Sequence, residues 1–216
     1  MTRSLLRWAL ILSGVCLLPI AVIRAQPYDD SELRAFLTPP DGCPVPCFMG
    51  LRPGVTTTGE ALAILGNHEW VKDLGDINLD DFPDPSNIPI SSASWRWNSL
   101  GPQWLSSTGR YMDGLNGSFW VEDGKVVSLE MDTSIHIGDL ILVFGIPDKT
   151  AVLSYDGLSG DRVYDYSAWY RDEGIIMSTS GMCPFTSLYM RPVMIRFQEH
   201  APEFSESDTL HPGCRR

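Results

Sequence analysis

The chain carries one short pattern twice, at residues 57–66 and at residues 136–145. Each copy has a glycine in its third position, an acid in its fourth, and a run of apolar residues before a final glycine. A pattern that recurs within a chain usually marks a repeated supersecondary unit. We therefore expect an α+β protein of two tandem repeats, each a short helical element packed on an antiparallel sheet of roughly three to four strands.

Capping and stop residues predict that both copies form helices. In the first copy, Thr57 and Glu60 have the spacing of a capping box, and Gly66 is a candidate left-handed stop. The second copy is apolar on every side, so strand propensity competes there. We still expect a helix, because Asp139 suits a helix start and Gly145 suits a helix end.

Strand-like segments follow each copy. Residues 94–97, 151–155 and 188–197 are predicted strands, and Pro192 in the last of them indicates an edge or a bulge. Residues 119–131 and 166–178 each read as a hairpin around a turn that ends in glycine. Trp95 and Trp97 alternate with period two, so we expect them in the core.

The N-terminus has the layout of a signal peptide. Arg3 and Arg7 precede an apolar run that reaches Ile23, with Ala25 at the expected cleavage site. An uncleaved anchor stays open, although the run is short for a bilayer span. We expect export to the cell envelope or the medium. The expected segments are a signal peptide (1–25), a Pro-rich lead-in (26–50), the two repeats (51–133 and 134–200) and a tail (201–216).

Charge and cysteine content narrow the function. The chain has 16 basic and 27 acidic residues, a net charge of −11. Such a chain is repelled by nucleic acid and by anionic membranes, so we expect neither as a partner. The disulfide candidates are Cys43, Cys47, Cys183 and Cys214. A local 43–47 bridge, pairing of that segment with Cys183, a zinc site with His68, and a redox pair all stay open.

The motifs together resemble two families of exported α+β repeats, the outer-membrane assembly lipoproteins of the SmpA/OmlA type and the tandem-repeat β-lactamase inhibitory proteins. The resemblance spans roughly residues 50–197. It is carried by Gly54, Thr57, Leu65-Gly66, Asp123-Gly124-Lys125-Val126 and Phe144-Gly145-Ile146-Pro147. It implies helices laid on a sheet that serves as a protein-binding surface.

Candidate sites are few. Asp76, Asn78 and Asp80 alternate as at the start of a calcium loop. Asp81 and Asn87 then stand where that loop needs glycine and glutamate, which favours a solvated acidic loop. Trp104 lies in a Gly/Ser-rich segment and is a candidate partner contact.

No nucleophile elbow or phosphate-binding loop is present in the sequence. We therefore expect a non-enzymatic binding module without a cofactor or metal, with an unidentified protein as its partner. Two alternatives stay open. One is a carbohydrate- or envelope-binding protein that uses exposed tryptophans, and the other is a glycosidase-like hydrolase.

Overall fold

The computed structural model describes residues 29–75, 78–79, 91–105, 116–156, 160–183 and 188–200. The chain divides into two compact units, Met1–Glu32 and Leu33–Arg216, and the fold below is that of the second unit. The expected signal peptide and tail lie outside the described residues, and the other segment boundaries stay predictions. None of the described helices has the length and apolar composition that crossing a membrane requires.

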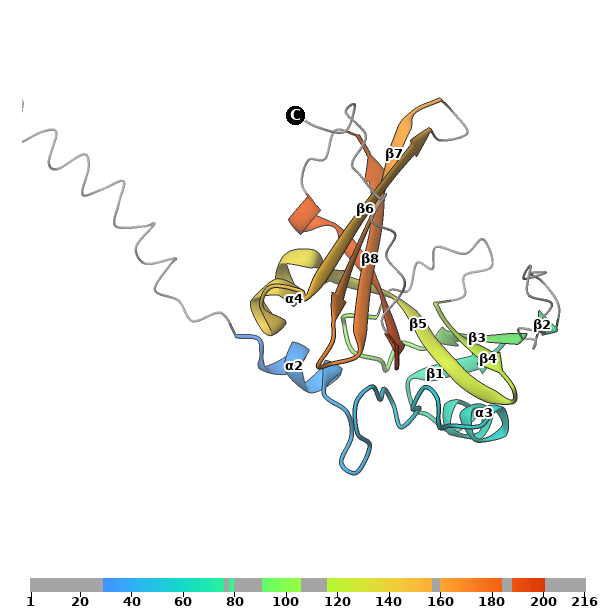
Figure 1. Ribbon diagram of the computed structural model, residues 1–216. Coiled ribbons are helices and arrows are strands. Elements are labelled where there is room, and N and C mark those ends of the chain that lie inside the picture. The colour runs from blue at the N-terminus through green and yellow to red at the C-terminus, as the bar shows by residue number, and fades with distance from the viewer. Residues whose placement is uncertain are drawn as a thin grey trace, which may run out of the picture. The chain divides into compact units, whose positions relative to one another are not determined.

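Three short α-helices and nine strands make up the described fold (Figure 1). In chain order they are α2 (Ser31–Leu37), α3 (Thr58–Gly66), β1 (Val71–Leu74), β2 (Asn78–Leu79), β3 (Ser91–Trp97), β4 (Gly117–Glu122), β5 (Lys125–His136), α4 (Ile137–Phe144), β6 (Lys149–Asp156), β7 (Arg162–Tyr170), β8 (Ile175–Met182), a 3₁₀ turn η1 (Leu188–Met190) and β9 (Pro192–Gln198).

The prediction of two tandem helix-on-sheet repeats is wrong. All the strands belong to one antiparallel sheet in the order β1-β3-β4-β5-β9-β8-β7-β6, with β2 paired to β3. The junction is the pairing of β5 with β9, which aligns Leu129 with Phe197 and Met131 with Ile195. Two separate sheets would leave both strands with unpaired backbone groups at exposed edges, and joining them removes those edges.

The predicted capping box at the start of α3 is confirmed. The Thr57 N–H donates to the Glu60 carboxylate at 2.9 Å, and the Glu60 N–H donates to the Thr57 hydroxyl at 3.4 Å. The predicted stop is wrong, because Gly66 still belongs to the helix and the cap is Asn67 in a right-handed conformation. The Asn67 side chain donates to the Ala63 carbonyl at 2.7 Å, which satisfies one of the last carbonyls without a left-handed residue.

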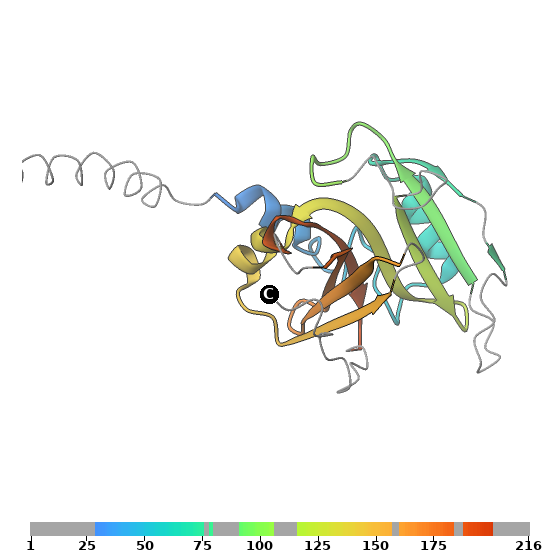
Figure 2. The ribbon, with the colours of Figure 1, turned by 90° about the horizontal axis from the view of Figure 1, so that it is seen from above.

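The second copy is helical, as predicted. The His136 N–H donates to the Asp139 carboxylate at 3.0 Å, and the helix ends at Gly145, whose φ is 84°. Helix α4 lies beside α2 (Figures 1 and 2), where the Arg34 guanidinium donates to the Val143 carbonyl at 2.7 Å.

Both predicted hairpins are present as β4–β5 and β7–β8. Asp123 and Gly124 turn the first with φ angles of 50° and 74°. Pro192 predicted an edge or a bulge, and the structure has the second of these. Strand β9 lies between β5 and β8, and Pro192 begins it beside an irregularity of the β5–β9 pairing, where a missing N–H costs no regular ladder bond.

The hydrophobic core lies on one face of the sheet, which we call the core face. It includes Trp95 and Trp97, as predicted, and also Phe119 and Phe197. The segment before α3 closes over it, and the Phe48 ring stacks on that of Phe197 at 5.1 Å. The opposite face, the outer face, bears residues such as Ser118, Glu130 and Arg196, which pair across β4, β5 and β9.

Candidate interaction surface at the sheet edge

The calcium hypothesis is left untested. Asp76 and Asp80 lie outside the described residues, and Asn78 is in β2, where it pairs with Ser92. Among the residues that the structure describes, no group of three or more histidines, cysteines or acids is placed to hold a metal ion.

Trp104 is held against the sheet. Its side chain is partly buried against the core, and its carbonyl accepts from the Ser134 N–H of β5 at 2.8 Å. The next residue, Leu105, forms a β-bridge with Thr133. Within the described part of the chain every tryptophan is buried or half-buried. The structure therefore does not gather Trp104 with other aromatic rings into an exposed platform.

Cys43 and Cys47 form a local disulfide, with their Cα atoms 6.0 Å apart. This bond decides between the possibilities that the sequence left open, because it uses both thiols and leaves neither for Cys183 or for zinc. Cys183 is itself disulfide-bonded, to a partner outside the described residues, and Cys214 also lies outside them. The bridged loop is structural, since Pro46 packs against the Gly174 turn of the β7–β8 hairpin.

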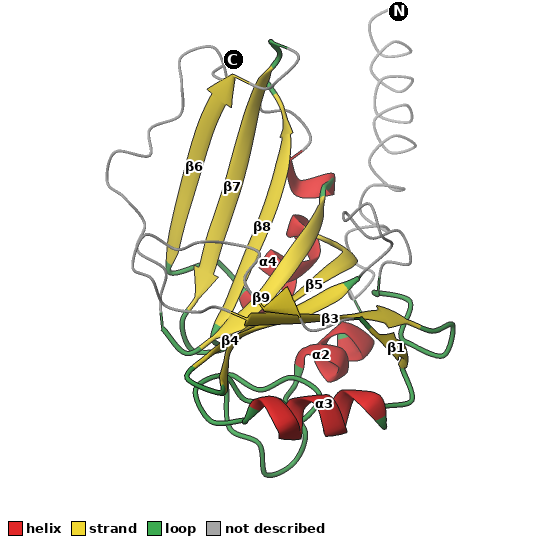
Figure 3. Ribbon diagram, turned by 90° about the vertical axis from the view of Figure 1, so that its right-hand side faces the viewer, coloured by secondary structure: helices red, strands yellow, loops and turns green. Residues whose placement is uncertain are grey.

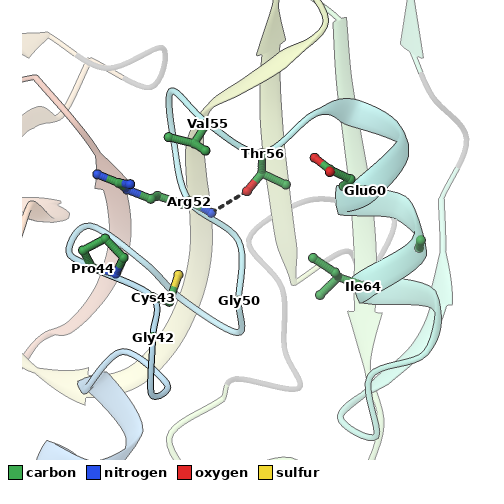
Figure 4. A pocket seen from close by; sticks show the side chains of 10 residues that line it. Gly42, Cys43, Pro44, Gly50, Arg52, Val55, Thr56, Glu60 and Ile64 are labelled. Carbon is green, nitrogen blue, oxygen red and sulfur yellow. Dashed lines mark hydrogen bonds between the residues drawn. The ribbon is translucent and has the colours of Figure 1, made fainter.

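A depression of about 490 Å³ lies between this loop and α3 (Figure 4). Two of its polar side chains, Thr56 and Glu60, are engaged in local structure. The Arg52 N–H donates to the Thr56 hydroxyl at 2.8 Å, and the guanidinium of Arg52 points away from Ile64 and Glu60. Glu60 belongs to the capping box, and its hydrogen bonds to Thr57 lower its pKa. These contacts hold the loop in place. Among the described lining residues, no set of reactive groups converges on the depression.

A second depression, of about 500 Å³, is lined by aromatic rings that include Phe36, Phe48 and Trp70. His68 stands at its side with its ring 4.9 Å from that of Trp70. The imidazole Nδ1 accepts from the Trp70 N–H at 3.2 Å, and burial lowers the pKa of His68. Both effects favour the neutral imidazole. By accepting the hydrogen bond from Trp70, the ring of His68 stabilises the turn that follows α3.

The outer face of β5 bears two buried acids, Glu130 and Asp132. Glu130 pairs with the Arg196 guanidinium of β9 at 2.5 Å, across the junction of the sheet. A buried carboxylate needs such a partner to offset its loss of hydration. The ion pair therefore stabilises the pairing of β5 with β9.

The strand β6, at one end of the described sheet, differs from the elements above in its regular pairing. This strand lies at the end of the strand order, and β7 is the one described strand that pairs with it (Figure 3). All eight residues of β6 pair with β7 in unbroken register, from Lys149↔Trp169 to Asp156↔Arg162. An edge strand that is long, regular and apolar is a template for another strand.

The opposite edge is protected against such pairing. Strand β1 has four residues, and its register with β3 shifts between Val71 and Asp73. The Asp73 carboxylate accepts from the Arg96 guanidinium at 2.7 Å, which places charges along that edge. Short length, a bulge and charge are the usual means by which sheets blunt an edge.

Exposed apolar side chains are most frequent in the second half of the chain, where Leu153 and Tyr155 belong to β6 and the others to α4, β8, η1 and the loop after α4. Of the ten exposed large hydrophobic residues described, seven lie between residues 142 and 190, namely Leu142, Ile146, Leu153, Tyr155, Met182, Tyr189 and Met190. Tyr155, Val163 and Met182 form one row across β6, β7 and β8 on the outer face. Asp165 beside Tyr155 raises the pKa of that phenol, so the hydroxyl keeps its proton as a donor.

Sequence reasoning found β6 as a strand but missed its position at an edge. The composition of residues 151–155 predicts a strand, but it carries no information on how many neighbours the strand has. No family model, curated protein or solved structure matches this chain. The arrangement of its residues therefore carries the functional argument.

Proposed function

We propose that this protein is an exported, non-enzymatic binding module that docks a protein partner at β6, the last strand in the described sheet order. The observation that carries the proposal is the contrast between the two sheet edges. One is short, bulged and charged, and the other presents eight residues in regular register, among them the exposed Leu153 and Tyr155.

Strand addition explains how such an edge would bind. The outward N–H and C=O groups of the edge pair with an extended segment, and alternate side chains supply selectivity. Leu153 and Tyr155 lie on the outer face of β6, with 49% and 46% of their surface exposed. An aromatic ring with a polar tip and an aliphatic neighbour is a common interface anchor.

Site-directed photo-cross-linking tests the proposal. A tagged chain with Tyr155→p-benzoylphenylalanine is expressed in its native host and irradiated, and adducts are identified by mass spectrometry. A matched chain carries the same group at Leu100, which is 72% exposed and precedes the Trp104 segment. We expect a protein adduct from position 155 and none from position 100. Adducts at position 100 alone would move the interface to the Trp104 segment, and none at either would refute protein binding.

Carbohydrate binding is the second candidate, and the aromatic depression beside His68 favours it. Trp70 is partly exposed there and could stack on a sugar ring, whereas Phe36 and Phe48 are buried and only support it. Calorimetric titration with envelope glycans tests this role. Heat that disappears with Trp70→Ala would support it, and unchanged heat in that variant would reject the depression as the site.

A further inference from the structure

We propose that the Cys43–Cys47 disulfide is a site of thiol–disulfide exchange, in which a small-molecule thiol attacks the sulfur of Cys43. The bond closes the loop at residues 43–47, whereas the proposed partner surface is on β6. The two roles are therefore independent. The loop keeps its structural role and gains a chemical one.

The two sulfurs of this bond differ in exposure. Cys47 is 1% exposed, whereas Cys43 is half-buried and lines the depression of about 490 Å³ beside α3. The Cys43 sulfur is directed toward the segment that holds Arg52 (Figure 4). Exchange begins when a thiolate reaches one sulfur of the bond, so access decides which sulfur is attacked. Cys43 is therefore the sulfur that reacts.

The exchange needs one accessible sulfur and an external thiolate, so it requires no converging set of reactive groups. The thiolate bonds to the Cys43 Sγ while the bond to the Cys47 Sγ breaks, and Cys47 leaves as a thiolate that takes up a proton. A second thiolate then attacks the external sulfur of the mixed disulfide and releases Cys43. In sum the protein disulfide gains two electrons and two protons, and two external thiols are oxidised to one disulfide.

Arg52 supplies a cation at the wall of the same depression. Its side chain is half-buried, and its Nε has no hydrogen-bond partner among the described residues. A nearby guanidinium stabilises a cysteine thiolate over the thiol. We therefore expect Arg52 to favour the thiolate of Cys43, which is the nucleophile when an oxidised small-molecule disulfide restores the bond.

The loop also has contacts that do not involve the bond. The Phe48 N–H donates to the Leu51 carbonyl at 3.0 Å, and the Leu51 N–H donates to the Phe48 carbonyl at 2.9 Å. The Phe48 ring stacks on that of Phe197, and the Cys43 N–H donates to the Pro40 carbonyl at 3.0 Å. Reduction should therefore release only the short segment between these contacts, so that the bond can form again in the folded protein.

Treatment of the intact protein with reduced glutathione tests the site of attack. The reaction is stopped with acid, free thiols are alkylated after denaturation, and peptide fragmentation in the mass spectrometer assigns each sulfur. We expect the glutathione adduct on Cys43 to exceed that on Cys47 at least about tenfold, with Cys47 as the free thiol. Equal adducts on both sulfurs, an excess on Cys47, or a bond that glutathione leaves intact would overturn the proposal.

Two single variants compare the sulfurs without the bond. Cys47→Ala leaves Cys43 as a thiol and Cys43→Ala leaves Cys47, so both chains have lost the same disulfide. Circular dichroism checks that they fold, and the glutathione experiment decides the question if one does not. Alkylation by N-ethylmaleimide, followed by peptide mapping, should be at least about tenfold faster at Cys43 than at Cys47. Equal rates would mean that the bond is only structural.

The same alkylation tests the cation. In the Cys47→Ala chain, Arg52→Gln should slow the reaction of Cys43 about threefold or more, because less of the thiol is ionised. Arg52→Lys keeps the charge and should restore most of the rate. A rate that Arg52→Gln leaves unchanged would remove Arg52 from the site.

Discussion

The close contact between Gly117 and Trp95 allows a sharp test of the core. The two residues oppose each other in the β3–β4 pair. A Cβ added at Gly117 would overlap Cε2 and Cζ2 of the Trp95 indole and lie 2.7 Å from its Nε1. Trp95 is 1% exposed, and its ring contacts those of Trp97 and Phe119, with centroids 5.4 and 6.5 Å away. The indole therefore has no open space into which it can move.

Gly117→Ala should lower the free energy of unfolding by about 3 kcal/mol, the upper part of the range for overpacked cores. The lower conformational entropy of alanine in the unfolded chain works against this by roughly 0.5–1 kcal/mol. The balance remains a large part of the total stability of a typical domain, about 5–15 kcal/mol. Trp95→Phe removes the indole atoms in question, so Gly117→Ala should cost far less in that background.

Urea denaturation followed by circular dichroism, with all four members of the double-mutant cycle, measures the effect. Gly59→Ala is the matched control, because a Cβ there meets nothing within 4 Å. It should stabilise α3 by roughly 0.5–1 kcal/mol. The packing argument fails if Gly117→Ala unfolds at the same urea concentration as the natural chain, or if its cost is unchanged by Trp95→Phe.

Three further outcomes follow from the described contacts. Thr57→Ala should cost about 1 kcal/mol of unfolding free energy through loss of the α3 cap, whereas Thr57→Ser should cost little, as urea titration can check. Joint replacement of Cys43 and Cys47 by alanine should cost about 2 kcal/mol for so short a loop, and an unchanged melting temperature would contradict this. Burial lowers the pKa of His68, so the unfolded chain binds more protons than the folded chain just below the ordinary value of about 6.5. Stability should therefore fall as pH drops from about 7 to 5, and His68→Gln should flatten that slope in urea titrations; an equal slope in both proteins would exclude His68 as its source.

Local elements followed from the sequence because their determinants are neighbours along the chain. The Thr57 and Glu60 groups cap α3 across a single turn, and Asp123 with Gly124 closes a hairpin whose strands adjoin it. The period-two tryptophans identified a strand with one buried face. Gly66 was misjudged because glycine only permits a left-handed cap, and the Asn67 side chain offered another.

The partner of Cys43 in the disulfide could not be predicted from the neighbouring sequence alone. Cysteine spacing allowed Cys43 to pair with Cys47 or with a distant thiol, and both were chemically reasonable. The choice follows from the position of the loop, where Pro46 lies against Gly174 and Phe48 against Phe197. These contacts join residues far apart in the sequence, so no pattern around the cysteines contains them.

The sequence by itself determined the starts of α3 and α4, the hairpin turns and the buried side of the strand that holds Trp95 and Trp97, because each depends on a few consecutive residues. Only the tertiary structure decided that β5 pairs with β9 and that β6 is left at an edge. Strand order arises when distant segments satisfy each other's backbone hydrogen bonds over a shared core. The candidate interaction surface depends on that order, so it emerges only once the sheet is assembled.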